Sequence, residues 1–239
     1  MQYECVIEGI FLARPNRFIA HVNVNGQTVI CHVKNTGRCR ELLIPGVKVL
    51  LEYHKDAQAK GRKTAYSLIG VWKNREGNSP LLINMDSQAP NQAAWEWLQK
   101  QRLPNFPSCQ ITEIRREVTY GNSRFDLAFL LDGHPSFMEV KGVTLEQDGM
   151  AMFPDAPTER GVKHLEELIS ASSNGFYCFI LFVIQMKEIT VFSPNRTTHP
   201  AFADALAAAE KAGVFVLAMD CQVSCCSMEI DSLVSYILN

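Results

Sequence analysis

The sequence lacks a long apolar run. Its longest apolar stretch, residues 176–184, has the length of a buried strand, whereas a membrane-spanning helix needs about 20 such residues. The first residues, MQYECVIEG, are acidic and do not resemble a signal peptide. We therefore expect a cytoplasmic protein with no membrane association.

Paired cysteine motifs are also missing. The eight cysteines are dispersed along the chain, and without an export signal they are expected to be reduced thiols, several of them buried on strands. Cys221, Cys225 and Cys226 come close together near the end of the chain. They lack C-x2-C spacing and an obvious fourth ligand, so the sequence does not favour a zinc site.

The net charge of −2 is small and by itself argues against bulk attraction to nucleic acid. Its distribution is uneven, because residues 1–83 carry a net charge of +6 and residues 84–239 a net charge of −8. This division suggests a front domain that binds a polyanion and a rear domain that gathers carboxylates for cations. Random asymmetry between two domains is the alternative. The length of 239 residues and an apolar fraction of 47% fit one large or two small globular domains.

Residues 1–83 show short strand patterns separated by turns. Asn25-Gly26 predicts a tight two-residue hairpin, and residues 77–80 are expected to end the domain. Five short strands in one small domain are typical of an OB-fold barrel. The expected strands cover residues 4–13, 17–24, 27–33, 48–53 and 64–72.

Basic side chains gather at the turns of this predicted barrel. OB-folds often bind single strands through a basic groove with aromatic platforms, so these residues are candidates for phosphate contact. Each of them could instead be a solvated surface charge, but together they favour nucleic-acid binding. The candidates are Arg14 and Arg17 beside Phe18, then Lys34, Arg38 and Arg40, and a further cluster of Lys60, Arg62 and Lys63.

Residues 84–239 alternate between strand and helix patterns, which predicts a mixed α/β sheet. Thr158 can cap a helix over residues 158–172. Arg160 and Lys163, with His164, lie on neighbouring positions of this helix. They could contact a phosphate or be ordinary surface charges. The other expected helices cover 91–100 and 200–212, and the expected strands cover 111–120, 125–131, 136–140, 176–183, 188–192 and 214–219.

The segment SRFDLAFLLDGHPSFMEVK, residues 123–141, reads as a β-hairpin with three charged residues in its apolar strands. Glu139 and Lys141 are two apart and share a face, and a loop over residues 132–135 would place Asp126 opposite Lys141. Unpaired charges on interior strands are costly, and a bound cation would compensate them. A salt-bridged patch on a solvated sheet face is the alternative.

Two carboxylates and an amine suit metal-assisted phosphodiester cleavage. Mg²⁺ and Mn²⁺ prefer oxygen ligands, which Asp126 and Glu139 would supply. Lys141 would position the attacking water or stabilise the developing negative charge. Glu117, nine residues before Asp126, is a candidate third metal ligand. Its alternative role is an ion pair with one of three nearby arginines, Arg115, Arg116 or Arg124.

The three charged residues of the hairpin resemble the PD-(D/E)xK nuclease core, with Phe125 where that pattern often has proline. Five segments spread along the chain together resemble the sugar fermentation stimulation protein A (SfsA) family. These segments are NTGR at 35–38, SRFDL at 123–127, MEVKGVTL at 138–145, FPDAPTERGVKHLEEL at 153–168 and FSPNR at 192–196.

This resemblance implies an N-terminal OB-fold domain, residues 1–83, followed by a PD-(D/E)xK nuclease-like domain, residues 84–239. It also implies DNA binding without marked sequence preference, cleavage of DNA and RNA, and a link to the regulation of maltose metabolism. Asp126, Glu139 and Lys141 occupy the nuclease positions. Two hypotheses follow: a metal-dependent nuclease, and a non-catalytic DNA-binding regulator of sugar metabolism. We favour the nuclease because all three charged residues are present.

Overall fold

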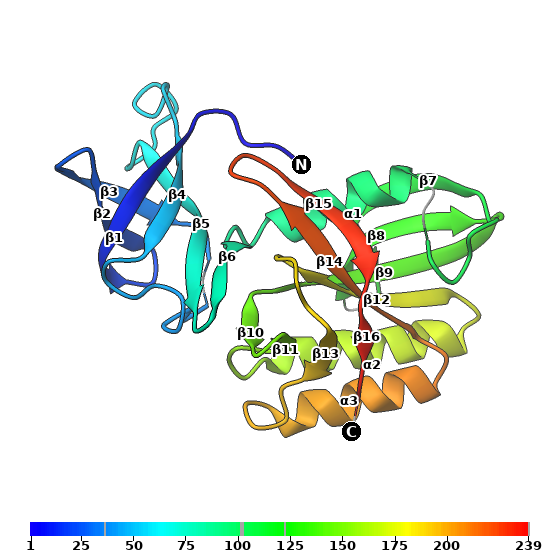
Figure 1. Cartoon of the computed structure of the whole chain (residues 1–239). Coiled ribbons are helices and arrows are strands. Elements are labelled where there is room, and N and C mark those ends of the chain that lie inside the picture. Colours follow the sequence, from blue (N-terminus) through cyan, green and yellow to red (C-terminus); the bar gives the residue numbers. More distant parts are fainter. Residues whose placement is uncertain (36, 101–102, 122, 239) are drawn as a thin grey trace. The chain divides into compact units, whose positions relative to one another are not determined.

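The computed structural model describes residues 1–35, 37–100, 103–121 and 123–238 (Figure 1). Thr36, from the NTGR motif, and Asn122, before the central hairpin, lie outside the described residues. The chain forms two compact units. The first unit contains Met1–Ala89, Gln185–Lys187 and Cys221–Glu229, and the second contains Pro90–Ile184, Glu188–Asp220 and Ile230–Asn239. The first boundary between the two units therefore follows Ala89 and not residue 83. Two short segments from later in the chain, Gln185–Lys187 and Cys221–Glu229, also belong to the first unit.

The first unit is built around a closed barrel. Its strands follow the order β3-β2-β1-β4-β5-β6, and a parallel pairing of β3 with β5 closes the ring. Asn25 and Gly26 both have positive φ, as a tight primed turn requires, and Val24 pairs with Gln27. The predicted OB-fold barrel is confirmed. Its strands are β1 Val6–Asn16, β2 Ile19–Val24, β3 Gln27–Val33, β4 Lys48–Tyr53, β5 Tyr66–Arg75 and β6 Asn78–Asn84.

The sequence did not predict β6. Residues 77–80, expected to end the domain, instead form part of a hairpin in which Arg75 pairs with Asn78. Gly77 supplies a positive φ of 69° in the turn, and Pro80 is tolerated because β6 is an edge strand. The glycine and proline therefore mark a turn within the sheet.

The second unit contains a mixed sheet with the strand order β15-β14-β12-β9-β8-β7. β12 runs parallel to β14 and β9, while β8 runs antiparallel to β9 and β7. A smaller sheet has the order β10-β11-β13-β16. These sheets and three helices confirm the predicted mixed α/β class. Their elements are α1 Ala89–Gln99, β7 Ile111–Tyr120, β8 Ser123–Leu131, β9 His134–Val143, β10 Leu145–Gln147, β11 Met150–Phe153, α2 Glu159–Ser173, β12 Tyr177–Ile184, β13 Val191–Pro194, α3 Pro200–Lys211, β14 Phe215–Val223, β15 Met228–Leu233 and β16 Ser235–Tyr236.

Helix α2 packs against β12 and lies beside α3 (Figure 1). Thr158 caps it as predicted, because its hydroxyl accepts a hydrogen bond from the Gly161 N–H at 3.1 Å. A Cβ on Gly161 would lie 2.8 Å from Cγ2 of Thr158 and 3.1 Å from Phe202 of α3, so this close approach requires glycine. The buried face of α2 carries His164 between its leucines and alanine. None of the described helices has the length and apolar character needed to cross a membrane.

The β8–β9 turn differs from the predicted four-residue loop. Asp132 and Gly133 both have positive φ and form a two-residue turn, so Leu131 pairs with His134. The predicted pairing of Asp126 with Lys141 is therefore wrong by two positions. Because the error is two residues, each side chain keeps the sheet face that the sequence predicted.

Candidate functional site

Asp126 and Glu139 lie where the β8–β9 ladder ends. The last paired residues are Leu127 and Met138, directly beside these two acids in the sequence. One oxygen of Asp126 accepts a hydrogen bond from the Val140 backbone N–H at 2.8 Å. Its other oxygen accepts one from the Asn91 side-chain amide at 2.7 Å. Two donors from two elements therefore fix the orientation of the Asp126 carboxylate.

Glu139 is only 2% exposed. Its Oε1 atom accepts hydrogen bonds from Nζ of Lys141, at 2.5 Å, and from Nδ1 of His164. His164 Nε2 in turn accepts from Nε of Arg160 at 3.2 Å, so the ring proton lies on Nδ1 and points at Glu139. The Oε2 atom of Glu139 is buried and has no hydrogen-bond partner among the described residues.

The surroundings of the two carboxylates move their pKa values apart. Burial, together with the nearby charge of Glu139, raises the pKa of Asp126 to about 6. Burial also opposes ionisation of Glu139, but the hydrogen bond from His164 and the positive charge of Lys141 outweigh it and lower the pKa of Glu139. At neutral pH the pair is therefore ionised, with Asp126 the less easily ionised member.

This arrangement fits a divalent cation that prefers oxygen ligands. Buried polar atoms are almost always hydrogen-bonded, so the unpartnered oxygen of Glu139 is an available ligand beside a second carboxylate, Asp126. Within the part of the chain that the structure describes, no group of three or more His, Cys, Asp or Glu side chains is placed to hold a metal. Two protein carboxylates, with water and a phosphate completing the coordination, suit Mg²⁺ better than an all-protein cage.

Glu117 does not join this carboxylate pair. It lies on β7, and its Oε2 atom forms an ion pair with Nε of Arg124 at 2.8 Å. Both side chains are about half exposed. The structure therefore shows the ion pair that the sequence offered as the alternative to metal binding, and it gives Glu117 a place on the sheet surface.

Two of the candidate phosphate contacts have their cationic groups engaged within the first unit. The Arg14 guanidinium donates to the backbone carbonyls of Arg17, Asn35 and Arg38 at 2.7, 2.9 and 2.7 Å. It therefore holds the turn after β1 against the segment after β3.

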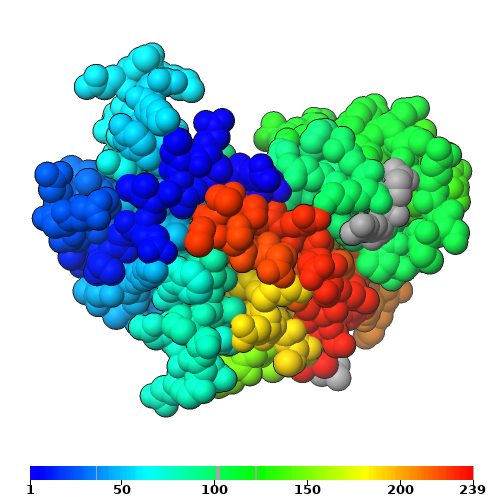
Figure 2. All heavy atoms as spheres, turned by 45° about the horizontal axis from the view of Figure 1, so that its top comes forward, coloured from blue at the N-terminus to red at the C-terminus, as the bar shows by residue number. Residues whose placement is uncertain are grey.

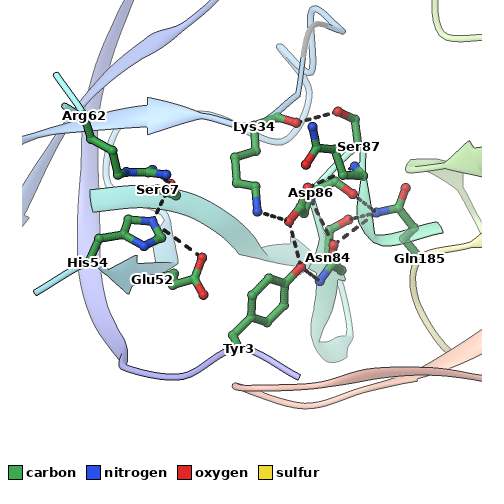
Figure 3. A network of polar contacts seen from close by, with 11 residues as sticks. Tyr3, Lys34, Glu52, His54, Arg62, Ser67, Asn84, Asp86, Ser87 and Gln185 are labelled. Carbon is green, nitrogen blue, oxygen red and sulfur yellow. Dashed lines mark hydrogen bonds and ion pairs between the residues drawn. The ribbon is translucent and has the colours of Figure 1, made fainter. Parts of the chain in front are cut away.

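Lys34, the second of these candidates, forms an ion pair with Asp86, which is only 2% exposed (Figure 3). Asp86 also accepts from the Tyr3 hydroxyl at 3.3 Å, and Asn84 and Gln185 extend the same buried network. Because a buried carboxylate needs a compensating charge, Lys34 neutralises Asp86 and supports the fold of the first unit.

The remaining basic candidates are more accessible. Arg17, Arg38 and Arg40 are exposed and line a cavity of about 600 Å³ in the first unit. Among the described residues their side chains form no ion pair. In the second unit Lys163 is exposed on α2, while Arg160 contacts His164.

Sequence reasoning missed the supporting role of Asn91 and the position of His164 beside Glu139. Asn91 lies at the start of α1 and contacts Asp126, a residue 35 positions later. His164 is 25 positions from Glu139 and occurs in a segment where it looked like a surface residue. The available signal for His164 was the apolar spacing of α2, which places residue 164 on the same face as Gly161, Leu165 and Leu168.

Comparison with known proteins gives consistent matches along the chain. Residues 12–79 match the SfsA N-terminal OB domain, and residues 88–226 match the Sugar fermentation stimulation protein RE domain. A Sugar fermentation stimulation protein homolog from Desulfitobacterium hafniense (strain Y51) is 53% identical over 235 residues, covering 98% of this chain and 97% of the relative. The homolog from Alkaliphilus oremlandii is 54% identical over 224 residues, or 92% of each chain.

A solved structure shows the same fold. SfsA from Pyrococcus furiosus superposes with a TM-score of 0.84 and is 28% identical, covering 99% of this chain and 98% of that one. Matches to both domains of the family, and relatives of about half identical sequence over nearly the whole length, agree with the barrel and the mixed sheet described above. The chain therefore belongs to the sugar fermentation stimulation protein (SfsA) family.

Proposed function

We propose that this protein binds nucleic acid and hydrolyses phosphodiester bonds of DNA or RNA with Mg²⁺ or Mn²⁺ held by Asp126 and Glu139. The observation that carries the proposal is the buried, unpartnered Oε2 atom of Glu139 beside a second carboxylate. The Pyrococcus furiosus relative is described as a complex with Ca²⁺. Ca²⁺ is a hard cation that takes oxygen ligands, as Mg²⁺ does, so this relative supports a cation-binding function.

The residues of the site have separate roles under this proposal. A divalent cation would neutralise charge on the scissile phosphate and lower the pKa of an attacking water. Asp126 and Glu139 would bind it without reorganising, because backbone and side-chain donors already fix both groups. His164, backed by Arg160, keeps Oε1 of Glu139 occupied and leaves Oε2 for the cation.

Lys141 would act on the substrate side of the site. Its ammonium lies 2.5 Å from Oε1 of Glu139 and is 15% exposed, so it is held close to the carboxylates but can reach a bound phosphate. A positive charge in such a partly buried position stabilises negative charge that develops on the phosphate, more strongly than it would in water. The same ammonium can donate a hydrogen bond to the attacking water.

The first unit supplies the docking surface in this proposal. Residues 1–83 carry a net charge of +6, and the exposed arginines Arg17, Arg38 and Arg40 gather around one cavity. Lys163 adds a cation on the second unit. Binding through such contacts releases counterions, so affinity should fall steeply with salt. Neutralising one phosphate-contacting arginine should reduce the slope of log K against log salt by about 1.

The decisive experiment uses end-labelled single-stranded and duplex oligonucleotides with Mn²⁺, Mg²⁺ or EDTA. We expect cleavage with either metal, none in EDTA, and loss of cleavage in Asp126→Ala and Glu139→Ala variants that still bind the oligonucleotide. Asp155→Asn removes an exposed carboxylate outside the site and is the matched control. Cleavage that persists in EDTA or in both alanine variants would refute the assignment.

One observation favours the second candidate, a non-catalytic DNA-binding regulator linked to sugar metabolism. Lys141 and His164 already satisfy one oxygen of Glu139 without a metal, as expected of a salt-bridged patch on a sheet. The same assay separates the two functions, because a regulator would bind the oligonucleotides with a steep salt dependence and cleave none of them with either metal.

A further inference from the structure

Two cavities in the first unit adjoin at the turn between β1 and β2. The first, of about 600 Å³, is lined by β1 and by the segment after β3, including Phe11, Arg17 and Arg38. The second, of about 510 Å³, is lined by Phe18, His32, Arg62 and Lys63, among others. Asn16 lines both. The two cavities therefore meet at this turn.

The turn between the cavities is rigidly built. The Asn16 side-chain carbonyl accepts hydrogen bonds from the backbone N–H groups of Phe18 and Ile19 at 2.9 and 3.1 Å. The Phe18 carbonyl accepts from the Val33 N–H at 2.8 Å, and Arg14 holds the Arg17 carbonyl at 2.7 Å. The cavity walls are therefore set before any ligand arrives, which lowers the entropy cost of binding.

The second cavity combines an exposed ring with fixed positive charge. Phe18 is 51% exposed and lines the cavity. Arg62 is anchored by donating to the Ser67 hydroxyl at 2.8 Å (Figure 3), which keeps its guanidinium beside the cavity. Lys63 follows it on the loop between β4 and β5, which projects from the first unit (Figure 2). Burial and the charge of Arg62 lower the pKa of His32, so its ring is neutral at pH 7.

The first cavity has a similar composition. Phe11 and Leu43 are buried and provide an apolar floor, while Arg17, Arg38 and Arg40 supply exposed cations. Among the described residues that line either cavity there is no Asp or Glu. A flat apolar ligand that carries a negative charge matches this combination, and each volume falls within the range typical of small-ligand sites.

A nucleotide has this chemistry, but only an unpaired base can enter a cavity. In a duplex the faces of the bases are stacked and their pairing edges are occupied, so only the phosphates of a duplex can contact the residues of the two cavities. A single strand can place a base against Phe18 and its phosphates against Arg62 and Lys63. Its next nucleotides can then cross Asn16 to the arginines of the first cavity.

We propose that the first unit binds consecutive unpaired nucleotides in these two cavities, and that the protein therefore prefers single strands to duplex. This inference rests on the proposed function only in taking nucleic acid as the ligand. It adds a selectivity that neither net charge nor the carboxylate site provides, because phosphate contacts alone would favour the duplex, which has the higher charge density.

Fluorescence anisotropy in EDTA tests the proposal, since no hydrolysis then interferes. The probes are a labelled 12-nucleotide DNA strand, the same strand in a blunt duplex, and an RNA strand of the same sequence. We expect a single strand to bind at least tenfold more tightly than the duplex. Comparing the DNA strand with the RNA strand shows which sugar the protein prefers. Phe18→Ala should weaken strand binding about 5- to 100-fold, the range of one base–aromatic contact, and should leave duplex binding unchanged.

Each variant has a matched control: one for Phe18→Ala and one for Arg38→Gln. Ile30→Ala removes another exposed apolar side chain of the first unit, 54% exposed and outside both cavities, and should leave binding unchanged. Lys55→Gln removes an exposed cation outside both cavities and should have a smaller effect than Arg38→Gln. Equal affinity for strand and duplex, or a Phe18→Ala variant that binds strands as the wild type does, would overturn the inference. Metal-dependent cleavage would then still support the proposed function, whereas failure to bind any probe in EDTA together with failure to cleave with either metal would reject both.

Discussion

Replacing Asp126 by asparagine should stabilise the metal-free protein at neutral pH. The folded protein raises the pKa of this carboxyl from the usual 3.8 to about 6, mainly through burial and then through the charge of Glu139. Ionised Asp126 therefore destabilises the folded state by at most about 3 kcal/mol above pH 7. Asparagine removes the charge but can accept only one of the two hydrogen bonds from Asn91 and Val140, which costs about 1 kcal/mol. The expected net gain is about 1 to 2 kcal/mol.

The pH dependence distinguishes this effect from a general change in packing. Because the folded state has the higher pKa, the stability from protonated Asp126 is complete below pH 3.8 and is lost as the pH rises through about 6. The advantage of the Asp126→Asn variant should therefore grow by about 1.4 kcal/mol between pH 5 and pH 8. Urea denaturation in EDTA at both pH values measures it. Asp155→Asn, an exposed carboxylate, is the control and should show no such growth.

Saturating Mn²⁺ supplies the second half of this test. A cation that binds only the folded wild type stabilises it by about 2.7 kcal/mol at a concentration of 100 times Kd. In Mn²⁺ the wild type should then be more stable than the Asp126→Asn variant. In EDTA we expect the opposite order of stability. If the difference between the two proteins stayed constant from pH 5 to pH 8, and Mn²⁺ did not alter it, the reasoning about the carboxylate pair would be refuted.

Three further predictions follow from individual contacts. His164→Phe removes a hydrogen bond to Glu139 and should weaken Mn²⁺ binding about 10- to 100-fold, measured by calorimetric titration. Glu117→Gln should leave Mn²⁺ affinity and cleavage within about twofold of wild type, because this side chain lies in an exposed ion pair. Lys34→Met leaves Asp86 buried without its counter-charge and should destabilise the protein by about 3 to 5 kcal/mol in urea denaturation; Lys34→Met combined with Asp86→Leu should recover much of this loss.

Local signals in the sequence predicted much of the barrel. The strand over residues 27–33 has the expected bounds, because Asn25-Gly26 fixes its start by turn geometry alone. The same rule applies to Asp132-Gly133, but Pro135 suggested a longer loop. The structure places Pro135 within β9, paired with Leu130. A local turn preference therefore prevailed over a residue that is usually uncommon inside strands.

The sequence could not predict which of the basic candidate residues are available to bind a ligand. Arg14 and Arg38 are both arginines near turns, and nothing in the sequence separates them. In the structure both arginines line the first cavity, but the Arg14 guanidinium donates to three backbone carbonyls, whereas Arg38 is exposed and its own carbonyl receives one of these bonds. The difference depends on how the turn after β1 meets the segment after β3. That contact is tertiary and has no periodic signature in the sequence.

The charges around the candidate site indicate why a cation and an anionic substrate would depend on one another there. Taken together, Asp126, Glu139 and Lys141 carry two negative charges and one positive charge. The net charge of −1 would repel a phosphodiester in this partly buried site, where charge is weakly screened. A divalent cation would change the sum to +1 and make the same position attractive to phosphate. On the proposed function, the second unit should therefore contribute to nucleic-acid affinity only with metal present, and affinity measured in EDTA should come from the first unit.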